Sequence, residues 1–473
     1  MTALGIRPEE ALAAVDTAAP VLARTAPVIR ASWLRAIADA LDTARDDLVE
    51  LAAAETHLTA QRLQGELRRT SFQARLLAER LATGALHDVR IDHADPAWPM
   101  GARPDIRRTQ LPIGPVLVFG AGNFPFAFGV LGGDTVSALA AGCPVLVKAH
   151  PGHPRLCRRL AELTARVLVA VDAPAGAFGL IEDIDAGARA VQDRRVKAVA
   201  FTGSTRGGRA LFDLAAARPD PVPFYGELGS TNPVIVSPEG WRTRASTIAE
   251  GFAASVTLGA GQFCTKPGVV LVPYADDFLA HLPPLPTAPM LEARIVAQYV
   301  DATTEMAGRA RLAAGELPGR QPTPVLFRAT VADLRRDPDL LDLEMFGPAA
   351  LIVDYDELDE LRAVVDALPG QLTGTVQGGD EPTETETDLL RRLAGRVGRV
   401  LWNDWPTGVT VSDAQHHGGP YPATTAPLST SVGTASVARF LRPVAFQNVP
   451  TTALPTELRD PSTENGPAEG NPA

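Results

Sequence analysis

A glycine-rich stretch at residues 259–268 places a cysteine where a nucleophile could act. Cys264 follows two glycines and precedes Lys266, directly after an apolar segment of helical pattern. Glycines let a backbone approach a ligand closely and point amide N–H groups at one spot. N–H donors and a nearby lysine favour the thiolate, the nucleophilic form of cysteine. We therefore expect a reactive thiol at Cys264, although an isolated cysteine is more often a buried apolar residue.

Glu227 is the second candidate for chemistry. It ends a short apolar stretch that begins at Phe224, and Leu228 and Gly229 follow it. A carboxylate among small and apolar residues should have a raised pKa, as a general base requires. The alternative is an acidic residue in a surface turn, which the surrounding apolar residues make less attractive. We expect Glu227 to be a general base.

The turn at residues 202–208 has the composition of a phosphate-binding loop. Gly203 permits close backbone approach, Ser204 offers a hydroxyl, and Gly208 lies in the first turn of a predicted helix whose N-terminus attracts anions. The turn lacks the usual G-x-G-x-x-G spacing, so an ordinary strand-to-helix turn remains an equal alternative. Lys148 ends another apolar strand, where a lysine needs an anion or hydroxyls such as those of a nucleotide ribose.

Alternating strands and helices position these residues. Continuous apolar strands are typical of a parallel sheet covered on both faces, and ligands bind such sheets at the carboxyl ends of the strands. The sequence therefore predicts a doubly wound α/β fold. The expected strands are 115–119, 144–149, 177–181 and 196–201, and the expected helices are 125–141, 155–171, 187–192 and the segment ending at 217.

The flanking regions predict further elements. Apolar residues spaced three and four apart indicate helices through residues 8–86, and the last of these carries Arg68, Arg69 and Arg75. A solvated face is the favoured interpretation of these arginines, and binding of a substrate carboxylate is the alternative. After Cys264 the pattern predicts a second α/β domain. Its expected strands are 269–273, 324–327, 349–353, 374–377 and 398–403, and its expected helices lie within 291–315 and 357–368.

Length and composition restrict the class of protein. The 473 residues are too many for one core, and 45% hydrophobic with 21% charged residues describes an ordinary globular protein. A net charge of −11 argues against nucleic acid or an anionic membrane as a partner. Three sparse cysteines and the absence of a signal-peptide pattern favour the cytoplasm.

Six motifs together resemble the aldehyde dehydrogenases, in the order seen in that family and across residues 5–450. One branch is more similar still, through residues 119–134, 147–154, 417–424 and 439–448: the α-ketoglutarate semialdehyde (2,5-dioxovalerate) dehydrogenases. NADP-dependent long-chain aldehyde dehydrogenases share that branch and remain an alternative. The motifs are Gly-Asn-Phe-Pro at 122–125, Lys148 after its strand, Phe-Thr-Gly-Ser-Thr at 201–205, Glu-Leu-Gly at 227–229, Gly-Gln-Phe-Cys at 261–264 and Glu-Met-Phe-Gly-Pro at 344–348.

The resemblance implies a role for each motif. Cys264 would attack the aldehyde, the Asn123 amide and the Cys264 N–H would hold the oxyanion, and Glu227 would activate water against the thioester. No metal is implied, and His416-His417 with Trp402 and Trp405 are candidates for the tunnel wall. The expected cofactor contacts are Lys148 and Glu344 on ribose hydroxyls, Gly203 and Ser204 near the pyrophosphate, Phe346 beside the nicotinamide, and His150, Gly208 and Leu228 nearby.

Two departures from the family pattern affect these expectations. Gly122 stands where the family often has tryptophan, which could reshape the tunnel. The run Lys148-Ala-His-Pro151 lacks the glutamate that favours NAD, and His150 and Arg209 could attract a 2′-phosphate. We therefore expect a preference for NADP, with NAD possible.

The resemblance also implies a domain plan. A Rossmann-type cofactor domain would comprise 1–88 and 113–229, a catalytic domain 230–435, and oligomerisation segments 89–112 and 436–450, with a helix at 436–441. A homodimer or homotetramer is expected. Residues 451–473, rich in Pro, Glu, Gly and Thr, are expected to be disordered. The alternative of another class is a cysteine hydrolase without redox chemistry, which would need a histidine base beside Cys264 and no nucleotide loop.

Overall fold

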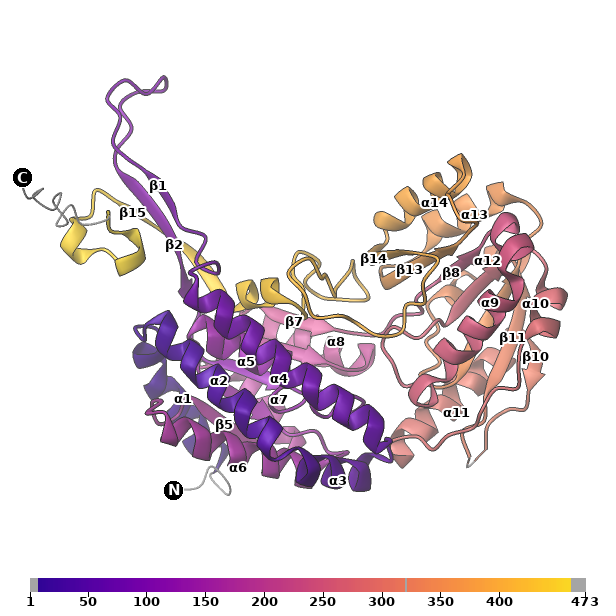
Figure 1. Ribbon diagram of the computed structural model, residues 1–473, viewed down its shortest axis with the longest axis horizontal. Coiled ribbons are helices and arrows are strands. Elements are labelled where there is room, and N and C mark those ends of the chain that lie inside the picture. Colours follow the sequence, from indigo (N-terminus) through magenta and orange to yellow (C-terminus); the bar gives the residue numbers. More distant parts are fainter. Residues whose placement is uncertain (1–6, 320, 461–473) are drawn as a thin grey trace, which may run out of the picture.

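Two lobes and a projecting arm make up the computed structural model, which describes residues 7–319 and 321–460 (Figure 1). The N-terminal lobe holds a five-stranded sheet, the second lobe a seven-stranded sheet, and the arm a three-stranded sheet. The doubly wound α/β prediction is confirmed for the first lobe. Within the described residues, no helix combines the length and the apolar character needed to cross a membrane.

Four helices precede the first sheet, as the spacing of apolar residues predicts. Two of them begin with proline at the first helical position, where its missing N–H costs nothing. The fourth is capped by the Thr59 side chain, which accepts from the Arg62 N–H. The helices are α1 (Pro8–Leu22), α2 (Pro27–Thr43), α3 (Arg45–Thr56) and α4 (Ala60–Ala82).

The first sheet has the order β5-β4-β3-β6-β7, and every neighbouring pair is parallel. Its central strands are apolar and buried, since helices cover both faces. Pairing in register sets Thr202 opposite Glu227 at one edge, the carboxyl end of the strands. The strands are β3 (Val116–Phe119), β4 (Val145–Lys148), β5 (Phe178–Ile181), β6 (Ala198–Thr202) and β7 (Phe224–Glu227), and the helices are α5 (Gly133–Ala141), α6 (Pro154–Ala170), α7 (Ile184–Gln192) and α8 (Thr205–Ala216).

The helix predicted at 125–141 begins only at Gly133. Residues 125–132 form tight turns instead, and a Cβ on Gly129 would lie 2.0 Å from the Pro125 carbonyl oxygen. Gly129 therefore serves a close approach of backbone to backbone rather than a costly helix interior.

The second sheet has the order β10-β11-β12-β9-β8-β13-β14, parallel except for β10 against β11. Four elements of this lobe were not predicted: β8, α10 and α12 are too short to show a pattern, and α14 carries few apolar residues. The expectation of helix through 291–315 is wrong for 311–315, which form the strand β10. The strands are β8 (Val234–Val236), β9 (Val269–Val272), β10 (Arg311–Gly315), β11 (Val325–Thr330), β12 (Ala349–Asp354), β13 (Gln371–Gln377) and β14 (Val397–Trp402), and the helices are α9 (Pro238–Thr257), α10 (Ala275–His281), α11 (Ala293–Ala307), α12 (Val331–Arg336), α13 (Leu358–Ala367) and α14 (Glu384–Ala394).

The arm joins two segments distant in the chain. Strands β1 (Arg90–Asp92), β2 (Ile106–Pro112) and β15 (Leu441–Gln447) pair antiparallel, and the arm projects from the first lobe (Figure 1). The helix expected at 436–441 is a 3₁₀ segment, Thr434–Phe440.

The disorder predicted for residues 451–473 is wrong for 451–460. Two 3₁₀ turns form there, and Leu458 is fully buried. Arg107 holds this segment, because it donates to the Leu458 carbonyl oxygen at 2.7 Å and pairs with Asp460. Residues 461–473 lie outside the described part of the chain.

Candidate active site

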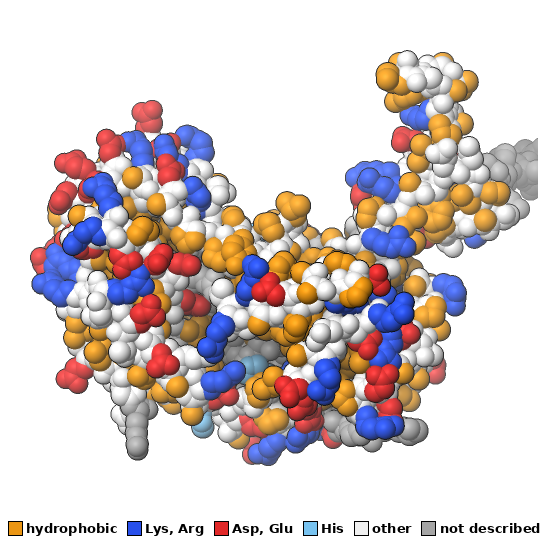
Figure 2. Space-filling view, turned by 180° about the vertical axis from the view of Figure 1, so that it is seen from behind, with side chains coloured by type: hydrophobic (Ala, Val, Ile, Leu, Met, Phe, Trp, Pro, Cys, Tyr) orange, Lys and Arg blue, Asp and Glu red, His pale blue; other side chains and the backbone are white. Residues whose placement is uncertain are grey.

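Cys264 lines a cavity whose walls come from both lobes. Figure 2 shows the surface hollowed between the lobes. The turn before it carries positive φ angles at Gly259 (58°), Ala260 (55°) and Gly261 (68°). A Cβ on Gly261 would lie 2.2 Å from the carbonyl carbon of Gly347, so only glycine permits this contact. The turn brings the half-buried Cys264 into the lining of two cavities at once.

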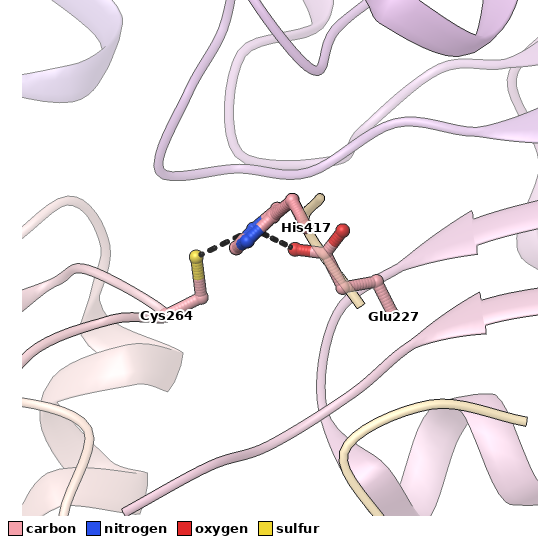
Figure 3. A group of neighbouring side chains, drawn as sticks. All are labelled: Glu227, Cys264 and His417. Carbon is pink, nitrogen blue, oxygen red and sulfur yellow. Dashed lines mark hydrogen bonds and ion pairs between the residues drawn. The ribbon is translucent and has the colours of Figure 1, made fainter. Parts of the chain in front are cut away.

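Three side chains meet at the thiol (Figure 3). The Cys264 Sγ is 3.6 Å from Nε2 of His417, and the same nitrogen is 2.7 Å from Oε1 of Glu227. That oxygen does not lie along a ring N–H direction, so the contact is not an aligned hydrogen bond, and it becomes an ion pair only when His417 is protonated. Ser431 donates its hydroxyl to the other carboxylate oxygen. The backbone N–H of the buried His417 donates to Oγ1 of Thr430 at 2.8 Å.

The prediction of a favoured thiolate is wrong for the resting protein. Burial, followed by the charges of Glu227 and Glu344, raises the pKa of Cys264 well above its usual value. Lys266 does not offset them, because its Nζ donates to the Ala349 carbonyl oxygen at 2.6 Å. Cys264 is therefore a thiol at neutral pH and needs a base to become a nucleophile.

The raised pKa expected for Glu227 is also wrong. Burial acts in that direction, but the charge and contact of His417 and the hydrogen bond from Ser431 outweigh it and lower the pKa. Glu227 is thus a carboxylate at neutral pH. It can stabilise a protonated imidazole beside it and accept a proton in turn.

His417 is a candidate functional residue that sequence reasoning missed, since it was expected only in the tunnel wall. The sequence does not show that residue 417 folds back against the glutamate of a distant strand. The only signal was the His-His-Gly-Gly run within a segment that resembles one family branch. Ligand atoms of Cys264, Glu227 and His417 lie within 4.8 Å of one another, a grouping that could also hold a metal ion, whereas no metal was expected.

Asn123 lines the same cavity as Cys264. Its side-chain nitrogen donates to the Gln262 carbonyl oxygen at 2.9 Å. An amide nitrogen has two hydrogens, so one remains for another acceptor. The backbone oxygen of Asn123 accepts from Nη2 of Arg62 at 2.6 Å, which fixes the residue against α4.

Six of the eight residues expected to bind a cofactor line the first cavity. The Lys148 side chain is buried and packs against α7, since a Cβ on Gly187 of that helix would lie 3.0 Å from the Lys148 Cγ. Gly208 packs α8 onto the sheet, since a Cβ there would lie 2.2 Å from Cδ2 of Leu228. The six residues in the lining are His150, Gly203, Ser204, Leu228, Glu344 and Phe346.

This cavity fits a nicotinamide nucleotide. It lies at the carboxyl end of a doubly wound sheet, beside the N-terminus of α8, where backbone N–H groups attract phosphate. Glu344 offers a carboxylate to hydroxyls and approaches the backbone so closely that a Cβ on Gly229 would lie 2.5 Å from its Oε2. Arg294 of α11, which was not predicted, also lines this cavity, and its guanidinium group pairs with Glu292 at 3.0 Å.

His150 and Arg209 do not supply the positive charges expected of them. Burial and neighbouring cations lower the pKa of His150, so it is neutral. Its ring stacks on His153 and fills the space beside Gly122, where a Cβ would lie 2.5 Å from its Cε1. Arg209 pairs with Asp213 at 2.9 Å. The missing tryptophan at 122 is thus compensated by His150.

The second cavity, of about 190 Å³, lies on the other side of Cys264. Of the three arginines considered on α4, Arg69 lines it, Arg68 is exposed, and Arg75 pairs with Asp39 and Asp42. The tunnel-wall hypothesis for the two tryptophans is wrong. Trp402 packs over Gly378 and Trp405 over Gly251, away from both cavities at Cys264.

Several known proteins are similar to this chain in sequence. The sequence model of the aldehyde dehydrogenase family matches residues 7–283. An α-ketoglutaric semialdehyde dehydrogenase of Acinetobacter baylyi is 41% identical over 443 residues, which are 91% of this chain and 84% of that protein. The α-ketoglutaric semialdehyde dehydrogenase 2 of Azospirillum brasilense is 42% identical over 460 residues, 93% and 87% of the two chains.

Solved structures share the fold. A 3,6-anhydro-L-galactose dehydrogenase in complex with NAP has a TM-score of 0.77 at 22% identity and covers 93% of this chain and 91% of its own. A 1-pyrroline-5-carboxylate dehydrogenase from Thermus with bound NAD also has a TM-score of 0.77, at 19% identity, over 93% and 85%.

Proposed function

The chain belongs to the aldehyde dehydrogenase family, and from this premise we propose that it oxidises 2,5-dioxovalerate (α-ketoglutarate semialdehyde) to 2-oxoglutarate. The reaction class is NAD(P)-dependent oxidation of an aldehyde. One observation carries the proposal: Cys264 borders both the cleft at the N-terminus of α8 and the second cavity, with His417 and Glu227 at its sulfur.

His417 starts the reaction by taking the proton of the Cys264 thiol. The resulting imidazolium is stabilised by Glu227, whose pKa is already lowered by this neighbour. The thiolate then forms a bond to the aldehyde carbon, and the carbonyl electron pair moves to the oxygen. Asn123 and the Cys264 N–H would hold that oxyanion, since both residues line the same cavity, and one such donor typically contributes on the order of 100-fold in rate.

The nicotinamide of a bound nucleotide supplies the acceptor for the hydride. The residues that would hold the nucleotide are Gly203 with the N-terminus of α8, Glu344 and Arg294. Departure of the hydride leaves an acyl thioester on Cys264. Glu227, a carboxylate at neutral pH, accepts a proton from the attacking water, and the thiol is restored by protonation from His417.

The substrate is tested by a panel of aldehydes at fixed cofactor. We expect kcat/KM for 2,5-dioxovalerate to exceed that for succinic semialdehyde, glutaraldehyde and decanal, by about tenfold or more over the neutral aldehydes. A higher value for decanal would instead support a long-chain aldehyde dehydrogenase.

We propose NADP⁺ as the preferred nucleotide, now on the basis of Arg294. Pro151 stands where a repelling carboxylate would favour NAD⁺, and Arg294, which pairs with Glu292 at 3.0 Å, lines the cleft and can contact a 2′-phosphate. Arg294→Gln is expected to lower kcat/KM for NADP⁺ about tenfold and to leave that for NAD⁺ nearly unchanged. A wild-type enzyme that prefers NAD⁺ contradicts this assignment.

The Cys264–His417 pair also supports a second activity at the same thiol, the hydrolysis of esters. A histidine base beside the thiol is what a cysteine hydrolase requires. Release of p-nitrophenol from p-nitrophenyl acetate without nucleotide would show this activity. Ester cleavage with no aldehyde-dependent reduction of nucleotide would make the protein a hydrolase.

We also propose that the protein is a homodimer or homotetramer and that it acts in the cytoplasm. The arm exposes apolar side chains (Figure 2), and its outer strands leave backbone groups open to a second sheet edge. Cys143, Cys157 and Cys264 are all free, as expected in a reducing compartment.

A further inference from the structure

The second cavity at Cys264, of about 190 Å³, combines apolar walls with buried charge. Phe124, Phe128 and Phe263 line it, and so do the side chains of Arg62 and Arg69 from α4. The two residues are seven apart on one helix, close to two full turns, so both guanidinium groups point from the same face. An aldehyde bound to Cys264 must extend its remaining atoms into this space.

Both guanidinium groups are incompletely paired. Arg69 donates from Nε to the Val409 carbonyl oxygen at 3.2 Å, while its Nη1 and Nη2 are buried without a hydrogen-bond partner. Arg62 donates from Nη2 to the Asn123 oxygen, while its Nε and Nη1 are buried without one. Within residues 7–319 and 321–460, neither forms an ion pair. Burial lowers the pKa of both.

Glu66 does not satisfy the two arginines. Its Oε1 accepts from the backbone N–H groups of Phe126 and Ala127 at 2.8 and 2.9 Å, which engages it with the loop after β3. Even with Glu66 ionised, two guanidinium groups and one carboxylate leave a net positive charge in an apolar cavity. A buried, unpaired cation is costly unless an anion joins it.

We propose that Arg62 and Arg69 bind the carboxylate of the substrate and so select short aldehydes that end in an acid. The two free terminal nitrogens of Arg69 form the fork that grips a carboxylate through two parallel hydrogen bonds. Arg62 adds a donor and ties this anchor to Asn123, the proposed oxyanion residue. The proposal rests on the proposed function and names the residues that decide between its substrate classes.

The same geometry disfavours the long-chain alternative. A fatty aldehyde would displace solvent from the cavity and leave both cations buried without a counter-ion. A site built for hydrogen bonding discriminates strongly against an analogue that lacks the partner group. A carboxylate satisfies the cations, whereas an alkyl chain does not.

The test replaces Arg69 with methionine, which keeps the length of the side chain and removes the charge. We expect Arg69→Met to lower kcat/KM for 2,5-dioxovalerate about 100-fold or more and that for pentanal less than tenfold. Arg68→Met, at the exposed neighbouring position, is the matched control and should change neither. Arg69→Lys should restore only part of the loss, because an ammonium lacks the fork. Equal losses on both aldehydes, or no loss, would overturn the proposal.

A binding measurement separates this proposal from the catalytic one. Wild type should bind 2-oxoglutarate, the product, in titration calorimetry, and Arg69→Met should bind it at least tenfold more weakly. If Arg69→Met does not fold, Arg62→Met takes its place in the same titration. An enzyme that oxidises aldehydes with unchanged selectivity in the variants overturns the anchor alone. A wild type that oxidises no aldehyde overturns the proposed function, whatever the titration shows.

Discussion

Replacing Cys264 with serine is expected to lower aldehyde-dependent reduction of the nucleotide on the order of 10⁴-fold or more. A hydroxyl cannot substitute, because His417 is placed to deprotonate a thiol, and an alcohol is far harder to ionise. The measurement is the initial rate of absorbance change at saturating nucleotide and 2,5-dioxovalerate.

Nucleotide binding provides the control for this variant. The cleft contacts at Gly203, Glu344 and Arg294 do not depend on the sulfur, so the Kd of the nucleotide should stay within about threefold of wild type. A Cys264→Ser enzyme that retains substantial turnover would show that another group attacks the aldehyde.

Replacing His417 with asparagine is expected to lower kcat/KM by about 10²–10⁴-fold at neutral pH, the usual range for a lost general base. The effect should depend on pH. Because the pKa of Cys264 is raised, the variant forms thiolate by itself only in alkaline solution. Its rate should therefore climb about tenfold per pH unit into the alkaline range, whereas wild type should be much less steep.

His416 offers a matched control one position away. It lies outside the cluster of Cys264, Glu227 and His417, so His416→Asn should retain most activity and the wild-type pH profile. Equal losses in the two histidine variants, or an His417→Asn profile parallel to that of wild type, would remove His417 from the proton path.

Much of the scaffold could be predicted because its signals are local. The strands that became β3, β4, β6 and β9 are short, mainly apolar runs bounded by turns. Elements without such runs were not predicted correctly, because β10 is mostly exposed and the polar α14 buries only a few side chains. Residues 451–460 were expected to be disordered because their composition is polar. They are ordered because a distant arginine, Arg107, donates to the Leu458 carbonyl oxygen.

The exposure of Cys264 to a cavity could be predicted from its glycine-rich turn, but the pKa of its thiol could not. Lys266 is near Cys264 in sequence, yet the fold directs it to the Ala349 carbonyl oxygen. His417 is remote in sequence, yet it lies at the thiol. A pKa is set by neighbours in space and by burial, so sequence proximity gave the wrong direction for Cys264 and Glu227.

The surroundings of Gly122 give a second example of a feature that depends on neighbours in space and not in sequence. The loss of tryptophan at Gly122 was visible, but not that His150 would fill the space and become neutral there. Arg62 likewise looked like one of many polar positions on α4. Only its burial against Phe124 and Phe263 distinguishes it from the exposed Arg68.

The most direct test of the account measures, by mass spectrometry, whether an acyl group forms on the sulfur of Cys264. A Glu227→Gln enzyme is mixed with NADP⁺ and 2,5-dioxovalerate, quenched in acid, and digested for mass spectrometry. The account predicts that the peptide containing Cys264 gains the mass of the acyl group, alongside a burst of about one reduced nucleotide per subunit. An unmodified Cys264 peptide after such a burst, or an acyl group on another residue, would contradict it.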